Sequence, residues 1–236
     1  CQVFYQLPVA TGKTPDTTAD GGADVEGPSD APHDGEGRES VTVVIIARDV
    51  DHAALAARSV VANLQGVDAE ILVATGESLK DTDAETLLAI LPRVQTERIV
   101  LMTDGMVILN PVFLAHIAAP KALKVGTNEQ GDDIMSFSTH IPQMMYKSVL
   151  EPMLKEIVEL YPHTDIFDAY GHEAFKGVRP IMLPAWNQEM WLLPVVSKNP
   201  PLEALEKWAE TQCFAWISPQ SWTSTVVKFL EDRFPE

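Results

Sequence analysis

From residue 41 onward, short apolar runs alternate with amphipathic segments. Val41–Ala47, Glu70–Ala74 and Arg98–Thr103 are mostly apolar and rich in β-branched residues, which predicts three buried strands. Between them, Asp51–Leu64 and Thr82–Leu91 space their apolar residues along one helical face. Strand, helix, strand, helix, strand with short links predicts right-handed crossovers and a parallel sheet that helices cover on both faces.

The second half of the chain predicts further elements in a less regular order. Strands are expected at Ile134–Ser138 and Arg179–Leu183. Helices are expected at Met144–Leu160, Asp165–Phe175, Pro201–Cys213 and Pro219–Phe234. The whole pattern predicts one α/β domain over residues 41–236, with a mostly parallel central sheet flanked by helices.

Residues 1–40 differ in composition and are predicted to form a disordered tail. The segment 11–40 is rich in Gly, Pro, Asp and Glu, and Val25 is its one β-branched apolar residue. It carries eight acidic residues against Lys13 and Arg38. Such a segment buries too little apolar surface to offset the entropy lost on ordering.

Composition narrows the classes of partner. The chain has 236 residues, is 46% hydrophobic and has a formal net charge of −17, which argues against nucleic acid or an anionic membrane as its main partner. No apolar stretch approaches the roughly 20 residues of a transmembrane helix. The two cysteines, Cys1 and Cys213, exclude a disulfide framework. Cys1 allows two interpretations, a fragment boundary or a lipidated N-terminus followed by a polar tether.

The segment from Arg98 to Pro111 carries the strongest functional signal. Its apolar run stops at Asp104-Gly105 and resumes before Asn110-Pro111. A buried strand that ends in an acid delivers that carboxylate to the carboxyl edge of a parallel sheet, where open α/β sheets bind ligands. The sequence therefore predicts a ligand site that contains Asp104.

Several motifs together resemble a known class of enzyme. They are Arg48-Asp49 after the first strand, the acidic turn at Asp104, Asn110-Pro111, Thr139-His140-Ile141-Pro142 and Tyr146-Lys147. This order resembles the nucleotide-sugar-dependent transferases of GT-A type, and among them the bacterial capsule-polysaccharide and Stealth-like transferases. The resemblance covers roughly residues 41–234 and is sharpest at 100–111 and 138–147.

The resemblance implies a fold, a reaction and a place in the cell. The fold would be a single Rossmann-like, GT-A-like domain. The reaction would be transfer of a sugar or sugar phosphate from a nucleotide sugar to a carbohydrate acceptor, in the synthesis of a bacterial polysaccharide or glycoconjugate. Nucleotide-sugar chemistry belongs to the cytoplasm, whereas a lipid anchor at Cys1 would place the chain at a membrane surface.

The candidate site residues fall into three groups. The donor would be bound by Arg48, Asp49, Asp104 and Lys147. The substrate would contact His140, Tyr146 and Trp186, the last as a stacking wall for a sugar ring. An acid that deprotonates the acceptor hydroxyl would be Glu173, which resembles the acid on the helix after the acceptor loop, or Asp168.

The predicted cation site is incomplete at the sequence level. The family pattern is Asp-x-Asp, which holds Mn²⁺ or Mg²⁺ against the diphosphate. Here the positions read Asp104-Gly105-Met106, so a cation would have Asp104, and His140 as a second candidate ligand. Because Met106 stands in place of the second carboxylate, the alternative is a catalytically inactive binding or interaction protein of the same fold, in one version anchored through Cys1.

Overall fold

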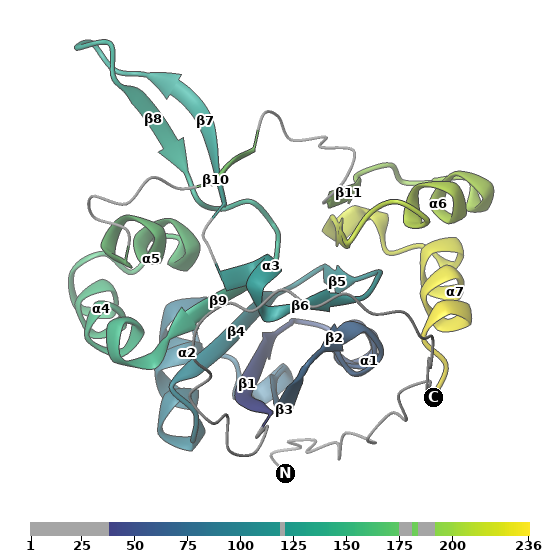
Figure 1. Cartoon of the computed structure of the whole chain (residues 1–236), viewed down its shortest axis with the longest axis horizontal. Helices are drawn as coiled ribbons and strands as arrows, with labels where there is room; N and C mark the ends of the chain where they lie inside the picture. The colour runs from purple at the N-terminus through teal and green to yellow at the C-terminus, as the bar shows by residue number, and fades with distance from the viewer. Residues whose placement is uncertain (1–37, 119–120, 175–180, 184–191) are drawn as a thin grey trace, which may run out of the picture.

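The computed structural model describes residues 38–118, 121–174, 181–183 and 192–236. Its central sheet has the strand order β3-β1-β4-β9 (Figure 1). These strands are β3 (Val67–Ala74), β1 (Glu39–Ile46), β4 (Arg98–Thr103) and β9 (Gln143–Tyr146). β1 pairs in parallel with both β3 and β4, whereas β9 runs antiparallel to β4. Residues 41–47 are all buried, as expected for a strand covered on both faces.

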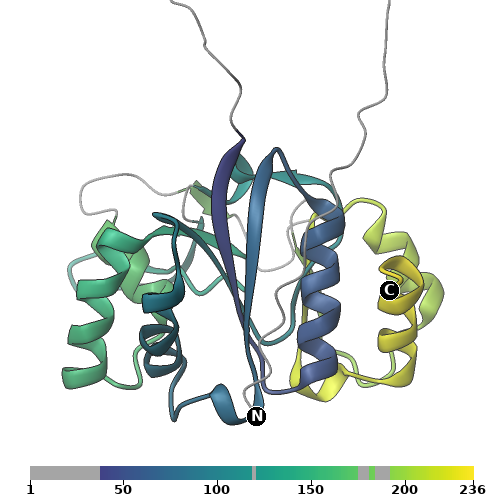
Figure 2. The same ribbon diagram turned by 90° about the horizontal axis from the view of Figure 1, so that it is seen from below.

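Helices form a layer on each face of this sheet (Figure 2). One face is covered by α1 (Val50–Asn63), with α6 (Leu202–Ala209) and α7 (Ser224–Arg233) beyond it. The other face is covered by α2 (Asp83–Ile90), α4 (Lys147–Leu160) and α5 (Ile166–Ala174). The predicted alternation of strands and helices in the first half of the domain matches these elements.

The predicted mostly parallel sheet is wrong, because the sheets are mixed. A second sheet contains β10 (Ile181–Leu183), β7 (Lys121–Thr127) and β8 (Asp133–Ser136) in that order, and a third contains β11 (Leu192–Val195), β12 (Phe214–Ile217) and β5 (Met106–Ile108). β7 pairs antiparallel with β8, and β12 pairs antiparallel with β5. A two-stranded sheet joins β2 (Leu64–Gln65) to β6 (Val112–Phe113). Residues 144–146, predicted as the start of a helix, lie in β9 because this segment pairs with β4.

Shorter elements complete the fold. They are the helix α3 (Leu114–Ala118) and three 3₁₀ turns at Gly76–Ser78, Leu91–Arg93 and Pro219–Ser221. Among the described residues, no helix is long and apolar enough to cross a membrane. The predicted tail lies outside the described residues up to position 37, and β1 begins at Glu39, two residues before the predicted strand.

Asn110 joins the C-terminal part of the chain to the strand that follows the Asp104 turn. Its Nδ2 donates to the backbone carbonyls of Ala209 and Gln212, both at 2.6 Å. Its Oδ1 accepts from the Arg233 guanidinium at 2.6 Å, and Arg233 Nε donates to the Leu109 carbonyl at 3.0 Å. The asparagine of the Asn110-Pro111 pair therefore holds α6 and α7 beside β5.

Lys121 is a buried cation that gives the fold a pH dependence. Its side chain is buried, with 2% exposure for the residue, and its Nζ donates to the His116 carbonyl near the end of α3. Burial lowers the pKa of Lys121 from 10.5 to about 8. Between these two values the unfolded chain binds a proton that the folded chain has released, so stability rises with pH.

We therefore expect the free energy of unfolding to increase by up to about 3 kcal/mol between pH 8 and pH 10.5. This is the difference between the folded and unfolded pKa values of Lys121, converted to free energy. Urea unfolding at several pH values measures the slope. Lys121→Met is the control, because it keeps the length of the side chain without a titrating group. Equal slopes in the two proteins would contradict this assignment.

Candidate functional site

A cleft of about 1010 Å³ opens at the carboxyl ends of β1 and β4. The chain leaves β1 through α1 to reach β3 on one side of β1, and returns through α2 to β4 on the other side. The order of the strands therefore reverses between β1 and β4, and ligands of open α/β sheets bind at such a point. Asp104 lines this cleft, at the edge where the sequence predicts it.

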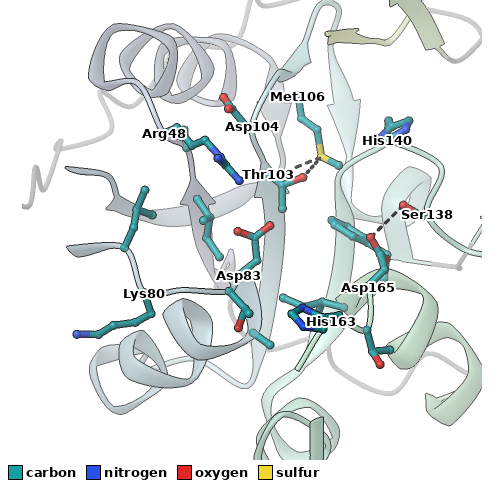
Figure 3. A pocket seen from close by; sticks show the side chains of 18 of the residues that line it. Arg48, Lys80, Asp83, Thr103, Asp104, Met106, Ser138, His140, His163 and Asp165 are labelled. Atoms are coloured by element: carbon teal, nitrogen blue, oxygen red, sulfur yellow. Dashed lines mark hydrogen bonds between the residues drawn. The ribbon is translucent and has the colours of Figure 1, made fainter. Parts of the chain in front are cut away.

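Arg48, Asp83 and Asp104 form one side of the cleft, which we call the first wall (Figure 3). Arg48 follows β1, Asp83 is the first residue of α2, and Asp104 follows β4. The side chain of Asp83 is open to the cleft, yet the surrounding protein removes part of its hydration and raises its pKa. The charge of Arg48 lowers this pKa in part, whereas the charges of Asp165 and Asp104 raise it further.

Asp104 has an unsatisfied acceptor. Its Oδ1 is buried and accepts no hydrogen bond from any residue that the structure describes. A buried acceptor without a donor costs about 1–3 kcal/mol, so natural proteins retain few of them. Because this oxygen is buried, a ligand in the cleft can donate a hydrogen bond to it, and so recover that cost, only if the residues that cover it move.

The opposite side of the cleft, which we call the second wall, carries Ser138, His140 and Asp165 (Figure 3). His140 has a φ of 55°, and its ring stacks on Trp216 with a centroid distance of 4.0 Å and an interplanar angle of 12°. Left-handed backbone is uncommon outside glycine and is concentrated at functional sites. Burial lowers the pKa of His140, partly offset by the charge of Asp165, so the imidazole is neutral at pH 7.

Asp165 connects the second wall to the start of α5 through two hydrogen bonds. Its Oδ2 accepts from the Ser138 hydroxyl at 3.1 Å, and its Oδ1 accepts from the Asp168 backbone N–H at 3.0 Å. Oδ2 therefore positions the loop that leads to His140, whereas Oδ1 caps the first turn of α5. The carboxylate of Asp165 adds a negative charge to the cleft, and its hydrogen bonds stabilise the fold.

Met106 occupies the position at which the family pattern has a second carboxylate. Only 1% of Met106 is exposed, and the Thr103 backbone N–H donates to its sulfur at 3.4 Å. Among the described residues, no group of three or more His, Cys, Asp or Glu side chains could hold a metal ion. Asp104 and His140, the predicted ligands, lie on opposite walls (Figure 3). A Mn²⁺ or Mg²⁺ ion held between the protein and a diphosphate therefore stays a prediction.

Three predicted donor-binding or substrate residues have other contacts. Asp49 caps the N-terminus of α1, because its Oδ1 accepts from the backbone N–H groups of Asp51 at 2.9 Å and His52 at 3.1 Å. These bonds hold the pKa of Asp49 below its usual value. Tyr146 pairs with Arg98 at the start of β4, and Lys147 Nζ donates to the Val94 carbonyl at 2.7 Å. Since β9 is antiparallel to β4, Tyr146 and Lys147 lie at the end of the sheet opposite Asp104.

The predicted acids of α5 lie outside the residues that line the cleft. Asp168 accepts hydrogen bonds from the backbone N–H groups of Phe137 and Ser138, the latter at 3.1 Å, and from the Ser136 hydroxyl. This carboxylate therefore holds the loop after β8. Glu173 is exposed near the end of α5. Trp186, the predicted stacking wall, lies outside the described residues.

The sequence-predicted candidates include neither Asp83 nor Trp216. Asp83 follows Thr82, which the sequence marks as a helix start, but nothing in the pattern shows that this helix begins beside the end of β1. Trp216 comes from β12, whose pairing with β5 brings it opposite Met106. Both residues reach the cleft through tertiary contacts.

A scan against protein-family models finds no matching family, and a search of curated proteins finds no match for this chain. A fold class by itself does not assign a reaction. The function is therefore argued from the geometry and chemistry of the cleft.

Proposed function

We propose that the protein is a transferase that binds a nucleotide sugar in the cleft and passes its sugar or sugar phosphate to a carbohydrate acceptor. The observation that carries this proposal is the buried Oδ1 of Asp104, which needs a hydrogen-bond donor, on the same wall as the Arg48 guanidinium. Sugar and ribose hydroxyls are such donors. A guanidinium binds phosphate through bidentate hydrogen bonds to two of its oxygens.

The size and lining of the cleft support the same class of ligand. Its volume of about 1010 Å³ lies at the upper end of the range typical of small-molecule sites, as a nucleotide sugar requires. The acids in the lining outnumber the basic groups Arg48 and Lys80. The diphosphate would therefore lie against Arg48 and Lys80, and the uncharged sugar would lie beside the acids. The stacked rings of His140 and Trp216 would provide an aromatic surface for it.

The resemblance at residues 100–111 and 138–147 supports a GT-A-like arrangement within the α/β fold and a role in bacterial polysaccharide or glycoconjugate synthesis. On this proposal the protein works in the cytoplasm, where nucleotide sugars are made. The second candidate is a catalytically inactive binding protein on the same scaffold. It is favoured by one observation, the buried thioether of Met106 where the family pattern has a carboxylate.

Thermal unfolding with a panel of nucleotides and nucleotide sugars, each with and without Mn²⁺, tests the proposal. A ligand at about 100 times its dissociation constant adds about 2.7 kcal/mol of stability, which raises the melting temperature of a domain of this size by about 5–10 °C. We expect such a rise for at least one nucleotide sugar, together with release of its nucleotide over time. A rise without release would favour the binding protein, and no rise with any compound would reject both.

A further inference from the structure

Asp83 has a carboxylate that the fold does not use. It is the first residue of α2, but Thr82 caps that helix, since the Thr82 hydroxyl accepts from the Glu85 backbone N–H at 3.2 Å. The Glu85 carboxylate accepts in return from the Thr82 backbone N–H at 3.1 Å. Because this reciprocal pair satisfies the start of the helix, the side chain of Asp83 is left to face the cleft (Figure 3).

Two other acids on this side of the molecule, Asp165 and Asp168, are engaged in hydrogen bonds. Asp165 accepts from Ser138 and from the backbone of Asp168, and Asp168 accepts from the loop after β8. Asp104 has its Oδ1 buried at the end of β4. Asp83 differs from Asp165 and Asp168 because it forms no hydrogen bond or ion pair with any residue that the structure describes, and from Asp104 because its side chain is exposed at the cleft.

The charges that face Asp83 come from three other elements. Arg48 faces it from the segment after β1, Asp104 from the turn after β4, and Asp165 from the start of α5. Loss of hydration raises the pKa of Asp83, Arg48 opposes this shift, and the charges of Asp165 and Asp104 add to it. A carboxylate with a raised pKa is a stronger base than an ordinary aspartate.

We propose that Asp83 is the general base that deprotonates the acceptor hydroxyl. This inference rests on the proposed function. In the step, Asp83 takes the hydroxyl proton while the acceptor oxygen forms a bond to the anomeric carbon of the donor, or to its phosphorus in sugar-phosphate transfer. The bond from that atom to the leaving phosphate oxygen breaks, and the nucleotide leaves with the electron pair. Asp83 then loses the proton to water.

Hydrolysis of the donor tests this role without knowledge of the acceptor, because water replaces the acceptor hydroxyl. The probes are UDP-glucose, UDP-N-acetylglucosamine and GDP-mannose, with nucleotide release as the assay and thermal stabilisation as the measure of binding. In Asp83→Asn we expect kcat to fall by about 10²–10⁴-fold, the usual contribution of a general base, while stabilisation by the donor is retained. The acidic limb of the pH profile of kcat/KM should disappear in this variant.

Asp51→Asn is the matched control. Asp51 lies in the first turn of α1 as Asp83 lies in the first turn of α2, so both variants lose the same charge next to a helix N-terminus. Asp51 is not among the residues that line the cleft. We expect Asp51→Asn to keep the kcat and the pH profile of the wild type.

The two proposals fail in different ways. If the wild type releases nucleotide and Asp83→Asn does so at a similar rate, or with the same acidic limb, Asp83 is not the base and the transferase assignment stands. An equal loss of kcat in Asp83→Asn and Asp51→Asn would also overturn the role of Asp83. If no donor stabilises the wild type, the proposed function itself falls, and the role of Asp83 falls with it.

Discussion

Replacing Asp104 by alanine is expected to stabilise the ligand-free protein and to weaken its stabilisation by a nucleotide sugar. The buried Oδ1 of Asp104 accepts no hydrogen bond from the described residues, so the wild type carries the cost of an unsatisfied polar group. Removal of the carboxylate removes this cost. We expect the free energy of unfolding to rise by about 1 kcal/mol, the lower end of the range for such groups.

The effect on ligand binding has the opposite sign. In the proposed complex, a hydroxyl of the donor satisfies Oδ1, so the same carboxylate that destabilises the free protein contributes to affinity. Loss of a buried, charge-assisted hydrogen bond costs about 1.5–3 kcal/mol, a roughly 10–100-fold weaker affinity. At a donor concentration that gives about 2.7 kcal/mol in the wild type, about 0.4–1.4 kcal/mol of stabilisation should remain in Asp104→Ala, at most about half of the wild-type effect.

Paired thermal and urea unfolding of wild type, Asp104→Ala and Asp51→Asn, each with and without donor, measures both effects. The variant at Asp51 removes a charge outside the cleft and should respond to donor as the wild type does. A large loss of stability in ligand-free Asp104→Ala would show that the carboxylate serves the fold. Unchanged stabilisation by the donor would place the ligand elsewhere.

The sequence predicts the part of the site that strand ends supply. β1 and β4 are continuous buried runs, so their ends could be located, and with them Arg48 and Asp104. His140 also reaches the cleft, as its place after a predicted strand suggests. These residues depend on local patterns, and local patterns are what a single sequence contains.

Strand direction and long-range pairing determine the parts of the fold and of the site that the sequence does not predict. The pair Met144-Met145 fits a helical apolar face as well as a short strand. The sequence therefore predicts a helix from Met144, where the structure has β9. Its antiparallel pairing with β4 is what carries Tyr146 to the far end of the sheet. The segment Phe214–Ile217 is too short to show a strand pattern, yet as β12 it brings Trp216 into the cleft.

Alanine in place of Gly105 is expected to cost about 2–5 kcal/mol of stability, the largest effect that we predict for the fold. Gly105 has a φ of 85°, a conformation that costs an L residue about 1–2 kcal/mol. A Cβ at this position would also lie 2.2 Å from the backbone carbonyl oxygen of Ile217. Because that atom belongs to β12, relief of the clash requires the strand to move away from β5. Such overpacking costs about 1–3 kcal/mol more.

Gly131→Ala separates these two causes. Gly131 has a φ of 89°, close to that of Gly105, but a Cβ there would meet nothing within 4 Å. The two substitutions therefore share the backbone penalty and differ in the contact with Ile217. We expect Gly131→Ala to lose only about 1–2 kcal/mol in urea unfolding. Equal losses in the two variants would contradict the steric argument.

Gly105→Ala is also expected to affect ligand binding in the cleft. The Ile217 backbone N–H donates to the Gly105 carbonyl at 2.9 Å, and the preceding residue, Trp216, stacks on His140. Movement of β12 in Gly105→Ala should therefore displace the stacked rings while Asp104 keeps its carboxylate. Stabilisation by the donor should weaken in Gly105→Ala and persist in Gly131→Ala. That contrast would mean that the second wall contributes to binding, whereas full retention in both variants would limit the ligand to the first wall.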